Sequence, residues 1–473
     1  MQRKRTDSGP QDPKLTQLSA ISPIDGRYWE QVKELSPYAS EGALIKTRVE
    51  VEARYLIALS EVGLVRPLVN DEEERLLNLG SQMSDEQVQR VKEIEDTTRH
   101  DVKAMERVFR EMVAGTSLED ATEMIHFGLT SEDVNNLSYR LMLGRAAREV
   151  CVQALDEIVE SFAKIADEYK ATPMLARTHG QAAVGTTLGK EMVDVAVRLN
   201  TQVRKLDDYQ LTGKLNGAVG DYNALALAAP KIDWIAFSEK FVKSLGLRPN
   251  LYTTQINPYE DVIEMLQTFQ RINGVILDAD QDMWRYISDN WFIQEVKKGE
   301  VGSSTMPQKV NPISFENSEG NVQIANSLFE GMGRKLAASR LQRDLSDSTT
   351  VRNMGMGLAY GLLGYKSILG GLSRVRPNEE TIAQALNENW VILTEGVQTV
   401  LRKAGVKDPY SLVAGLSRGQ RIGPSEWKDW ITGLPVDDKV KSFLRNITPN
   451  TYIGKAVELT DLALSEIAAS RRS

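Results

Sequence analysis

The chain contains one cysteine, Cys151, among its 473 residues. A single thiol cannot form an intramolecular disulfide, so a disulfide-stapled fold is excluded and we expect the reducing cytoplasm as the compartment. We interpret Cys151, which lies in a helical pattern, as a small buried apolar residue rather than a nucleophile. No apolar run approaches the roughly 18 residues of a membrane span. The N-terminal sequence MQRKRTDSGPQDPK lacks the apolar core of a signal peptide, so we expect residues 1–15 to form a disordered tail.

Basic residues are fewer than acidic residues. The chain has 57 Lys and Arg and 65 Asp and Glu, which gives a formal net charge of -8. Nucleic acids and acidic membranes attract basic surfaces, so neither is an expected partner. A small anionic substrate remains possible, since it needs only a local cluster of Arg and Lys. The length exceeds what one hydrophobic core usually serves, which predicts two or three domains.

Proline is absent from four stretches that are long enough for extended helices. These stretches lie between residues 67 and 173, 173 and 230, 258 and 307, and 312 and 377. Apolar residues recur within them at helical spacing, in residues 155–166, 188–206, 262–283 and 322–332. Such stripes bury one face of each helix, so we predict an all-α protein with a central bundle of long helices. Alternating strand patterns are scarce, and NLYTTQI, residues 250–256, is the strongest of them.

The two ends of the chain show shorter helical patterns than its centre. Breaks at SPIDGRY and TTRHDV mark the N-terminal part, and five closely spaced prolines mark the C-terminal part. We therefore expect an N-terminal helical domain at 16–115, a central long-helix bundle at 116–364 and a C-terminal helical domain at 365–473.

The chain has only three histidines, and each lies in a loop-like context with small or hydroxylated neighbours. They are His100 in TTRHDVKA, His126 in EMIHFGLTSEDVNN and His179 in ARTHGQAAVG. One such histidine alone would be interpreted as a structural residue at a helix end. Three of three favour a functional site. No two of them have the i, i+3 or i, i+4 spacing of metal ligands, so we expect no metal site.

The sequence GSSTMPQKVNP, residues 302–312, interrupts the helical pattern with hydroxyls, a cation and two prolines. A loop that only reverses the chain needs Gly or Pro, but not a lysine beside serines. Lys309 and Asn311 suit the dianionic carboxylate that forms when the adjacent carbon loses a proton, and Ser303 can act as the base if its alkoxide is stabilised. With His179 as an acid on the far side, oriented by a carboxylate such as Glu316, the chemistry becomes β-elimination.

A second polar segment, SRLQRDLSDSTTVRN, places Arg340, Arg343 and Arg352 among several hydroxyls. Guanidinium groups with hydroxyls make a good clamp for phosphate or carboxylate. The same segment also fits a helix N-terminus whose arginines pair with Asp344 and Asp347. Both interpretations stay open on this segment alone.

GSSTMPQKVNP resembles the signature of the fumarase/aspartase superfamily, written GSSxMPxKxNP. Within that superfamily, ten patches from about Leu18 to the end resemble the bacterial branch of the adenylosuccinate lyase family: SPIDGRY, TTRHDVKAME, HFGLTSEDVNNLSY, RTHGQ, GKLNGAVGDYNA, YTTQI, GSSTMPQKVNP, FENSEGN, QRDLSDST and VRN. The resemblance implies a three-domain fold, and a homotetramer in which three subunits share each active site. It also implies loss of fumarate from adenylosuccinate, giving AMP, and from the succinyl-aminoimidazole carboxamide ribotide SAICAR, giving AICAR, with no cofactor.

The resemblance further implies roles for matching residues. Ser303 resembles the general base that takes the Cβ proton, and His179 resembles the general acid, paired with Glu316. Lys309 and Asn311 match positions that hold the succinyl carboxylate, and His100 completes the catalytic set. Positions implied to grip the phosphate and nearby groups are Arg27, Tyr28, Arg343, Ser348 and Arg352. Further substrate-binding positions are Arg99, Asp101, Thr130, Ser131, Gln255, Ser304, Met306 and Asn311.

Three positions depart from the family pattern, with Arg99 in place of Asn, Ala182 in place of Pro and Gln308 in place of His. Ala182 loosens the backbone after His179, whereas the other two touch no proposed catalytic group. Argininosuccinate lyase is an alternative, because it shares MPQK, but SPIDGRY and the arginine segment favour a nucleotide phosphate. A helical scaffold without activity is a second alternative, and it needs none of the implied catalytic residues.

Overall fold

The computed structural model describes residues 15–296, 299, 305–306, 308–417 and 422–471. Of the expected tail, only Leu15 lies within this part. Helices dominate the described residues and the strands are short, which confirms the all-α prediction. The chain divides into two units, and the division into three domains stays a prediction. Unit 1 comprises residues 1–154, 205–273 and 320–364, and unit 2 comprises residues 155–204, 274–319 and 365–473.

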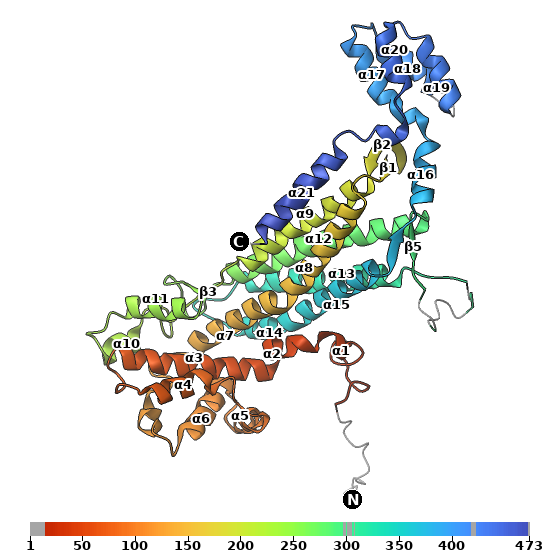
Figure 1. The fold of residues 1–473 in the computed structure, drawn as a ribbon. Helices are drawn as coiled ribbons and strands as arrows, with labels where there is room; N and C mark the ends of the chain where they lie inside the picture. Colours follow the sequence, from red (N-terminus) through yellow and green to blue (C-terminus); the bar gives the residue numbers. More distant parts are fainter. Residues whose placement is uncertain (1–14, 297–298, 300–304, 307, 418–421, 472–473) are drawn as a thin grey trace, which may run out of the picture. The chain divides into compact units, whose positions relative to one another are not determined.

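All the elements of the first 150 residues, which Figure 1 labels from α1 to α7, belong to unit 1. Its helices and strands are α1 (Trp29–Val32), α2 (Ser36–Ala39), α3 (Glu41–Glu61), α4 (Asn70–Leu79), α5 (Asp85–Thr98), α6 (Asp101–Val113), α7 (Ser131–Ala146), β3 (Thr212–Gly213), α10 (Asn223–Ala228), α11 (Trp234–Ser244), β4 (Arg248–Pro249) and α14 (Ser346–Val351). Three long helices have residues in both units: α12 (Glu260–Ser288), α13 (Ile313–Leu336) and α15 (Met354–Leu372).

Unit 2 holds most of the C-terminal part of the chain. Its elements are α8 (Gln153–Glu168), β1 (Pro173–Thr178), β2 (Gln181–Thr187), α9 (Leu188–Asp207), β5 (Phe292–Gln294), β6 (Val375–Pro377), α16 (Glu379–Asn387), α17 (Leu393–Lys403), α18 (Pro409–Ser417), α19 (Pro424–Thr432), α20 (Asp438–Arg445) and α21 (Ala456–Ser470). The first two residues of α8 and the last three of α9 fall in unit 1.

The long helices occupy the proline-free stretches as predicted. Helices α8, α9, α12 and α13 contain the four apolar stripes. The stripe residues Leu155, Leu199 and Ile272 are fully buried, so the faces that carry the helical periodicity are the faces that pack.

The strongest strand pattern in the sequence does not form a strand. NLYTTQI, residues 250–256, contains no strand beyond the two-residue β4 that precedes it. The longest described strands instead form the antiparallel hairpin β1–β2, with Pro173 paired to Thr187 and Thr178 paired to Gln181. Gln181 to Thr187 read QAAVGTT, and its Ala and Gly residues give little strand signal in the sequence.

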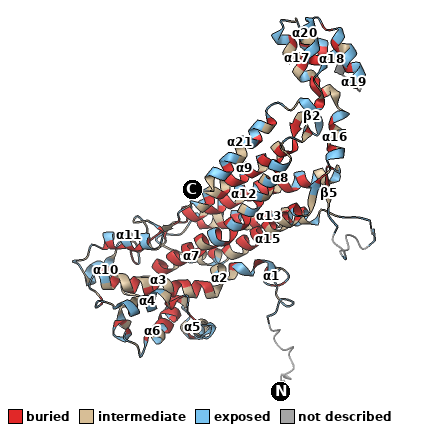
Figure 2. Ribbon diagram, viewed as in Figure 1, coloured by how far each residue is buried: buried red, intermediate tan, exposed pale blue. Residues whose placement is uncertain are grey.

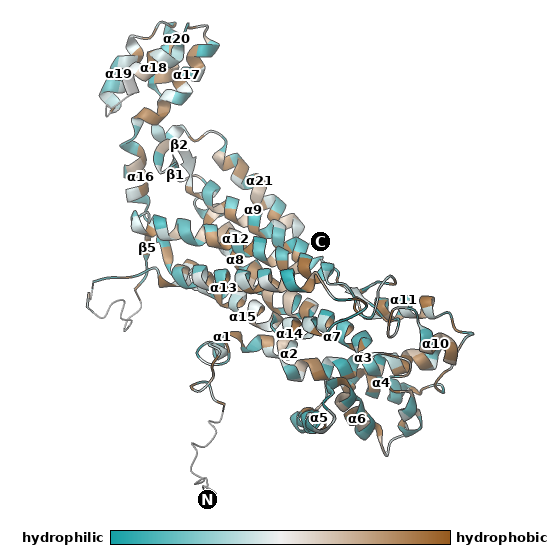
Figure 3. Cartoon of the chain, turned by 180° about the vertical axis from the view of Figure 1, so that it is seen from behind, coloured by the Kyte–Doolittle hydropathy of each residue, from teal (hydrophilic) through white to brown (hydrophobic). Residues whose placement is uncertain are grey.

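Helix α3 is the centre of unit 1, where it packs against α2, α4, α6 and α7. Its N-terminus is capped by the Ser40 side chain, which accepts a hydrogen bond from the Ala43 N–H. Figure 2 shows buried residues along most of α3 and α7. By contrast, α5 is largely hydrophilic in Figure 3, and Val91 and Ile94 are its buried residues. The core of unit 1 therefore lies around α3, and α5 covers its surface.

A buried ion pair ties the N-terminus of α7 to the loop after β3. Lys214 Nζ lies 3.1 Å from Asp133 Oδ1, and both side chains are fully buried. Asp133 also accepts hydrogen bonds from the N–H groups of Thr130, Asn216 and Gly217. Lys214 Nζ donates to the Gly217 carbonyl at 2.8 Å. The hydrogen-bond partners of both charges lie in the turn before α7 and in the loop after β3. The pair therefore holds these two segments against each other.

His126 fixes the segment before α7 to helix α3. Its Nδ1 lies 2.5 Å from Glu52 Oε1, and its backbone N–H donates to Glu52 Oε2. Glu52 is fully buried. Burial opposes the charged imidazolium, but the hydrogen bond and the charge of Glu52 outweigh it and raise the pKa of His126. The pair therefore joins the 126–130 loop to the core of unit 1.

The Asp133–Lys214 pair yields a stability prediction. Lys214→Met leaves the Asp133 carboxylate buried without its cation, so the free energy of unfolding should fall by about 3–5 kcal/mol. Chemical denaturation measures this change. Lys240→Met is the control, because Lys240 pairs with Glu61 on the surface and its loss should have little effect. Equal effects of the two substitutions would show that the buried pair does not organise the fold.

The His126–Glu52 pair yields a prediction about pH. A raised pKa in the folded state means that the pair stabilises the protein fully below about pH 6.5, the ordinary value for unfolded His. This stabilisation is lost as the pH rises through the higher folded pKa. His126→Asn removes the titrating ring and keeps a residue that tolerates the positive φ of 61°. The thermal midpoint of the variant should lie further below wild type at pH 6 than at pH 9, and a constant difference would contradict the linkage.

Candidate active site

The N-terminus of α7 brings several predicted site residues of unit 1 together. Thr130 caps the helix and Ser131 begins it. His100 caps α6 through Nδ1, which accepts the Lys103 N–H, and its Nε2 lies 3.5 Å from Ser131 Oγ. The hydrogen bond from Lys103 leaves Nε2 as the ring atom directed toward Ser131. His100, Thr130 and Ser131 thus form one polar cluster on two helix N-termini, where positive partial charge favours an anion.

Asp101 and Arg352 form an ion pair beside this cluster. Arg352 Nη2 lies 3.3 Å from Asp101 Oδ2, and Arg352 Nη1 donates to Glu41 Oε2 at 3.0 Å. The buried Arg48 donates to the same Asp101 oxygen at 2.7 Å. Burial opposes the charge of Asp101, but the two guanidinium groups outweigh it and lower the pKa of this carboxyl. Asp101 therefore stays ionised at neutral pH and orients Arg352.

Arg343 makes a second ion pair in the same part of unit 1. Its Nη1 donates to Glu132 Oε2 at 2.8 Å, and Glu132 directly follows Ser131. The sequence left open whether the arginines of this segment pair with Asp344 and Asp347. Only Arg340 does so among the described contacts, with Asp344. Arg343 and Arg352 instead pair with carboxylates on other segments, namely Glu132, Glu41 and Asp101.

Among the described contacts, the remaining predicted residues of unit 1 contact neighbouring segments rather than the side chains of His100, Thr130 or Ser131. Ser348 lies in α14 and donates its backbone N–H to the Asp347 side chain. Gln255 donates to the Ala218 carbonyl, next to the loop held by Asp133. Arg99 ends α5 in the left-handed conformation, with a φ of 55°, immediately before His100.

Arg27 lies over the Tyr28 ring, with 5.9 Å between its guanidinium carbon and the ring centroid. No hydrogen bond or ion pair among the described residues joins these two side chains to the cluster. Their implied role in gripping the phosphate stays a prediction.

In unit 2, His179 occupies the turn of the β1–β2 hairpin. Because Thr178 pairs with Gln181, His179 and Gly180 form a two-residue turn, with φ values of 53° and 73°. A hairpin turn of this kind needs positive φ at both positions, which histidine tolerates better than most residues. Arg177, next to the turn, makes a cation–π contact with Trp291, with 5.6 Å between its guanidinium carbon and the ring centroid. This contact holds the end of the hairpin in place. The imidazole of His179 is exposed at the tip of a braced hairpin.

Glu316 lies in the first turn of α13 and accepts a hydrogen bond from the Trp284 indole at 3.2 Å. Within the described part of the chain, no hydrogen bond or ion pair joins His179 to Glu316 or Lys309. The predicted pairing of His179 with Glu316 is therefore not made by the described contacts of one chain. Ser303 and Ser304 lie outside the described residues.

The described end of the signature loop comprises residues 305–306 and 308–312. The Lys309 N–H donates to the Met306 carbonyl at 3.1 Å, and the Gln294 side chain donates to the Val310 carbonyl at 3.2 Å. Met306 is about half exposed, and Asn311 has an intermediate exposure. These contacts anchor the end of the loop near β5.

Sequence reasoning missed the residues that support the site. Glu132 and Asp133 lie inside HFGLTSEDVNNLSY and Lys214 lies inside GKLNGAVGDYNA, but the motifs alone assign them no role. Their neighbours carried the recognised chemistry, and the burial of these charges is visible only in the fold. The two adjacent acids in TSEDVNN and the lysine in GKLNGAVG are the signal in the sequence that could have identified them.

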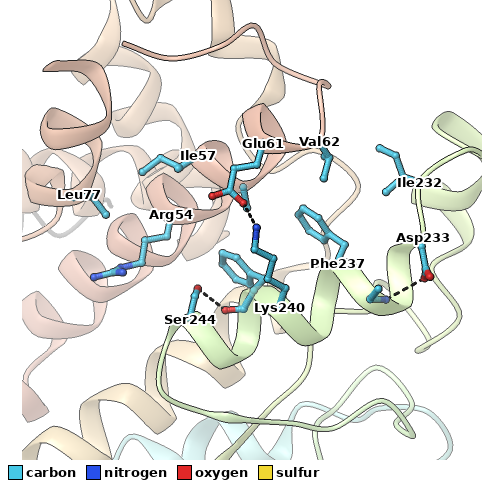
Figure 4. Close-up of a pocket in the computed structure, with 13 residues that line it drawn as sticks. Arg54, Ile57, Glu61, Val62, Leu77, Ile232, Asp233, Phe237, Lys240 and Ser244 are labelled. Atoms are coloured by element: carbon cyan, nitrogen blue, oxygen red, sulfur yellow. Dashed lines mark hydrogen bonds and ion pairs between the residues drawn. The ribbon is translucent and has the colours of Figure 1, made fainter. Parts of the chain in front are cut away.

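A cavity of about 560 Å³ lies elsewhere in unit 1. Figure 4 shows it between α3 and α11, with Phe237 directed into it. None of the predicted site residues lines it. Its polar groups already have partners in the fold, as in the Lys240–Glu61 ion pair, the Arg54–Glu50 ion pair and the Asp233 side chain that caps α11. The cavity therefore does not define a catalytic site.

The described residues contain neither a metal-binding cluster nor a membrane-spanning helix. No group of three or more His, Cys, Asp or Glu side chains there is arranged to hold a metal ion. No described helix is both long enough and apolar enough to cross a membrane.

Two family models match the chain. Residues 10–325 match the model described as Lyase, and residues 339–453 match the model described as Adenylosuccinate lyase C-terminal. Among solved structures, the chain is similar to a fumarate lyase from Mesorhizobium, with a TM-score of 0.73 and 16% identity over 92% of this chain and 97% of that one. It is also similar to the 3-carboxy-cis,cis-muconate lactonizing enzyme of Pseudomonas putida, with a TM-score of 0.71 and 16% identity over 94% and 99% of the two chains. At this identity the two structures show the fold alone.

Curated relatives are much more similar in sequence. The adenylosuccinate lyase of Haemophilus influenzae is 44% identical over 94% of this chain and 99% of its own length. The enzyme of Escherichia coli is 43% identical over the same shares. That of Dictyostelium discoideum is 46% identical over 93% of this chain and 97% of its own length. The chain therefore belongs to the adenylosuccinate lyase family of the fumarase/aspartase superfamily.

Proposed function

We propose that this protein eliminates fumarate from adenylosuccinate, giving AMP, and from SAICAR, giving AICAR. The observation that carries the proposal is the polar cluster of unit 1, where His100, Ser131, Arg343 and Arg352 gather beside two helix N-termini. Both substrates carry one phosphate and two carboxylates, so they need cations and N–H donors in one place. Family membership over nearly the whole chain supports the same reaction.

The elimination has two proton transfers. Ser303, as an alkoxide, takes the proton from the Cβ of the succinyl group, and the adjacent carboxylate takes up the negative charge as a dianion. Lys309 and Asn311 stabilise that dianion. The C–N bond then breaks, and His179 donates a proton to the leaving nitrogen, so fumarate and the amino product separate. Glu316 orients His179, while Arg343, Arg352 and Ser348 hold the phosphate.

The described contacts support a site shared between subunits. His179 lies on a hairpin in unit 2, and the described contacts of one chain leave it without Glu316 or Lys309 as a partner. We infer that these groups meet in a homotetramer, in which three subunits contribute to each active site. The partners of the chain are therefore its own copies and the two small substrates.

The base assignment gives a direct test. Ser303→Ala should lower kcat for adenylosuccinate by about 10²- to 10⁴-fold and leave KM within a few fold, because the base acts only in the transition state. Chromatography for AMP and fumarate measures the turnover. Ser304→Ala is the matched control, with a much smaller loss of kcat expected.

Three outcomes would count against the proposal. Near-normal turnover of Ser303→Ala would remove Ser303 from the role of base. A large loss in Ser304→Ala alone would assign that role to the neighbouring serine. Wild-type protein that cleaves argininosuccinate but not adenylosuccinate would contradict the proposed function itself.

A further inference from the structure

Glu132 is a buried carboxylate that the proposed mechanism does not use. It lies in the first turn of α7, directly after Ser131, and its side chain is 3% exposed. Oε2 accepts the hydrogen bond from Arg343 at 2.8 Å. Oε1 is also buried and has no hydrogen-bond partner among the described residues. A carboxylate in this position is held mainly by one guanidinium.

The other cations that face Glu132 already pair with carboxylates of their own. The groups facing it are Arg343, Asp347, Arg140, Lys214 and Tyr259. Arg140 makes a two-pronged ion pair with Asp261, with both distances 3.0 Å, and Lys214 pairs with Asp133. Asp347 adds negative charge and accepts the Tyr259 hydroxyl. Arg343 is therefore the cation that compensates Glu132.

Burial favours the neutral acid form of Glu132, whereas Arg343 favours the ionised form. A change in nearby charge can therefore shift its protonation. Burial raises the pKa of this carboxyl to about 7, although Arg343 favours the ionised form. Asp347 adds to the upward shift. A phosphate dianion on Arg343 would bring a further like charge close to Glu132, and a like charge favours the neutral acid. Phosphate binding and protonation of Glu132 should therefore favour each other.

We propose that Glu132 is a positioning residue that acts through Arg343: it holds the guanidinium while the site is empty, and it takes up a proton from solvent when a phosphate binds there. The proposal rests on the assignment of Arg343 to the substrate's phosphate under the proposed function. It explains how Arg343 changes partners without leaving a buried, ionised and uncompensated carboxylate, which is strongly unfavourable.

Calorimetric titration of the full-length protein with AMP tests this coupling. Titrations in buffers with different ionisation enthalpies, between pH 7 and 8.5, count the protons taken up on binding. The phosphate is already a dianion in this range, because its second pKa is about 6. The wild type should take up at most about half a proton at pH 7, and its affinity for AMP should fall about three- to fivefold from pH 7 to pH 8. The absence of proton uptake would overturn the proposal.

Glu132→Gln assigns the proton to this side chain. The amide oxygen can still accept the hydrogen bond from Arg343, but it does not titrate, so proton uptake and the pH dependence of the AMP affinity should both disappear. The control is Glu50→Gln, which changes a mostly buried carboxylate paired with Arg145 at 2.8 Å and should leave the proton uptake unchanged. Uptake that persists in Glu132→Gln belongs to another group and contradicts the proposal.

Two further variants keep the test decisive. Arg343→Gln should weaken AMP binding at least tenfold; unchanged affinity would refute the phosphate assignment of Arg343, and hence a part of the proposed function, independently of Glu132. If Glu132→Gln does not fold, Glu132→Asp replaces it. A change in the pH at which proton uptake is half-maximal supports the proposal, whereas an unchanged profile overturns it.

Discussion

The buried contact between Asp133 and Lys214 is the constraint on which the site of unit 1 depends. A fully buried ion pair is tolerated only when hydrogen bonds satisfy both charges. Asp133 meets this requirement with backbone N–H groups from both sides, and Lys214 meets it with the Gly217 carbonyl. Those hydrogen bonds leave little freedom to the turn that precedes α7. Thr130 and Ser131 are placed by that turn, and Glu132 follows them into the core.

The cations around this turn are held by carboxylates. Arg352 forms ion pairs with Glu41 and Asp101, and Arg343 forms an ion pair with Glu132. This arrangement reconciles the net charge of -8 with an anionic substrate, because the positive charge is local and already oriented. Under the proposed function, the substrate's phosphate competes with these carboxylates for the two guanidinium groups. Binding then proceeds by exchange of partners rather than by capture on unpaired arginines.

The sequence predicted the elements that local pattern controls. Helix α12 runs from Glu260 to Ser288 as its apolar stripe and the proline gap require. The β1–β2 hairpin was missed, because its small residues and its His-Gly turn carry little strand signal. In the site, the motifs predicted the residues that are expected to touch substrate. They did not identify Glu132 and Lys214, because both residues matter through burial and through distant contacts. Glu132 pairs with Arg343, 211 positions away, and Lys214 pairs with Asp133, 81 positions away.

Under the proposed function, no single copy of this chain carries a complete active site. Mixing Ser303→Ala subunits with His179→Ala subunits tests it most directly, because each variant alone lacks one proton-transfer group. Adenylosuccinate cleavage is then measured in assemblies shown to contain both variants. Some activity should return, since certain sites receive an intact Ser303 from one copy and an intact His179 from another. Verified mixed assemblies that stay inactive would contradict it.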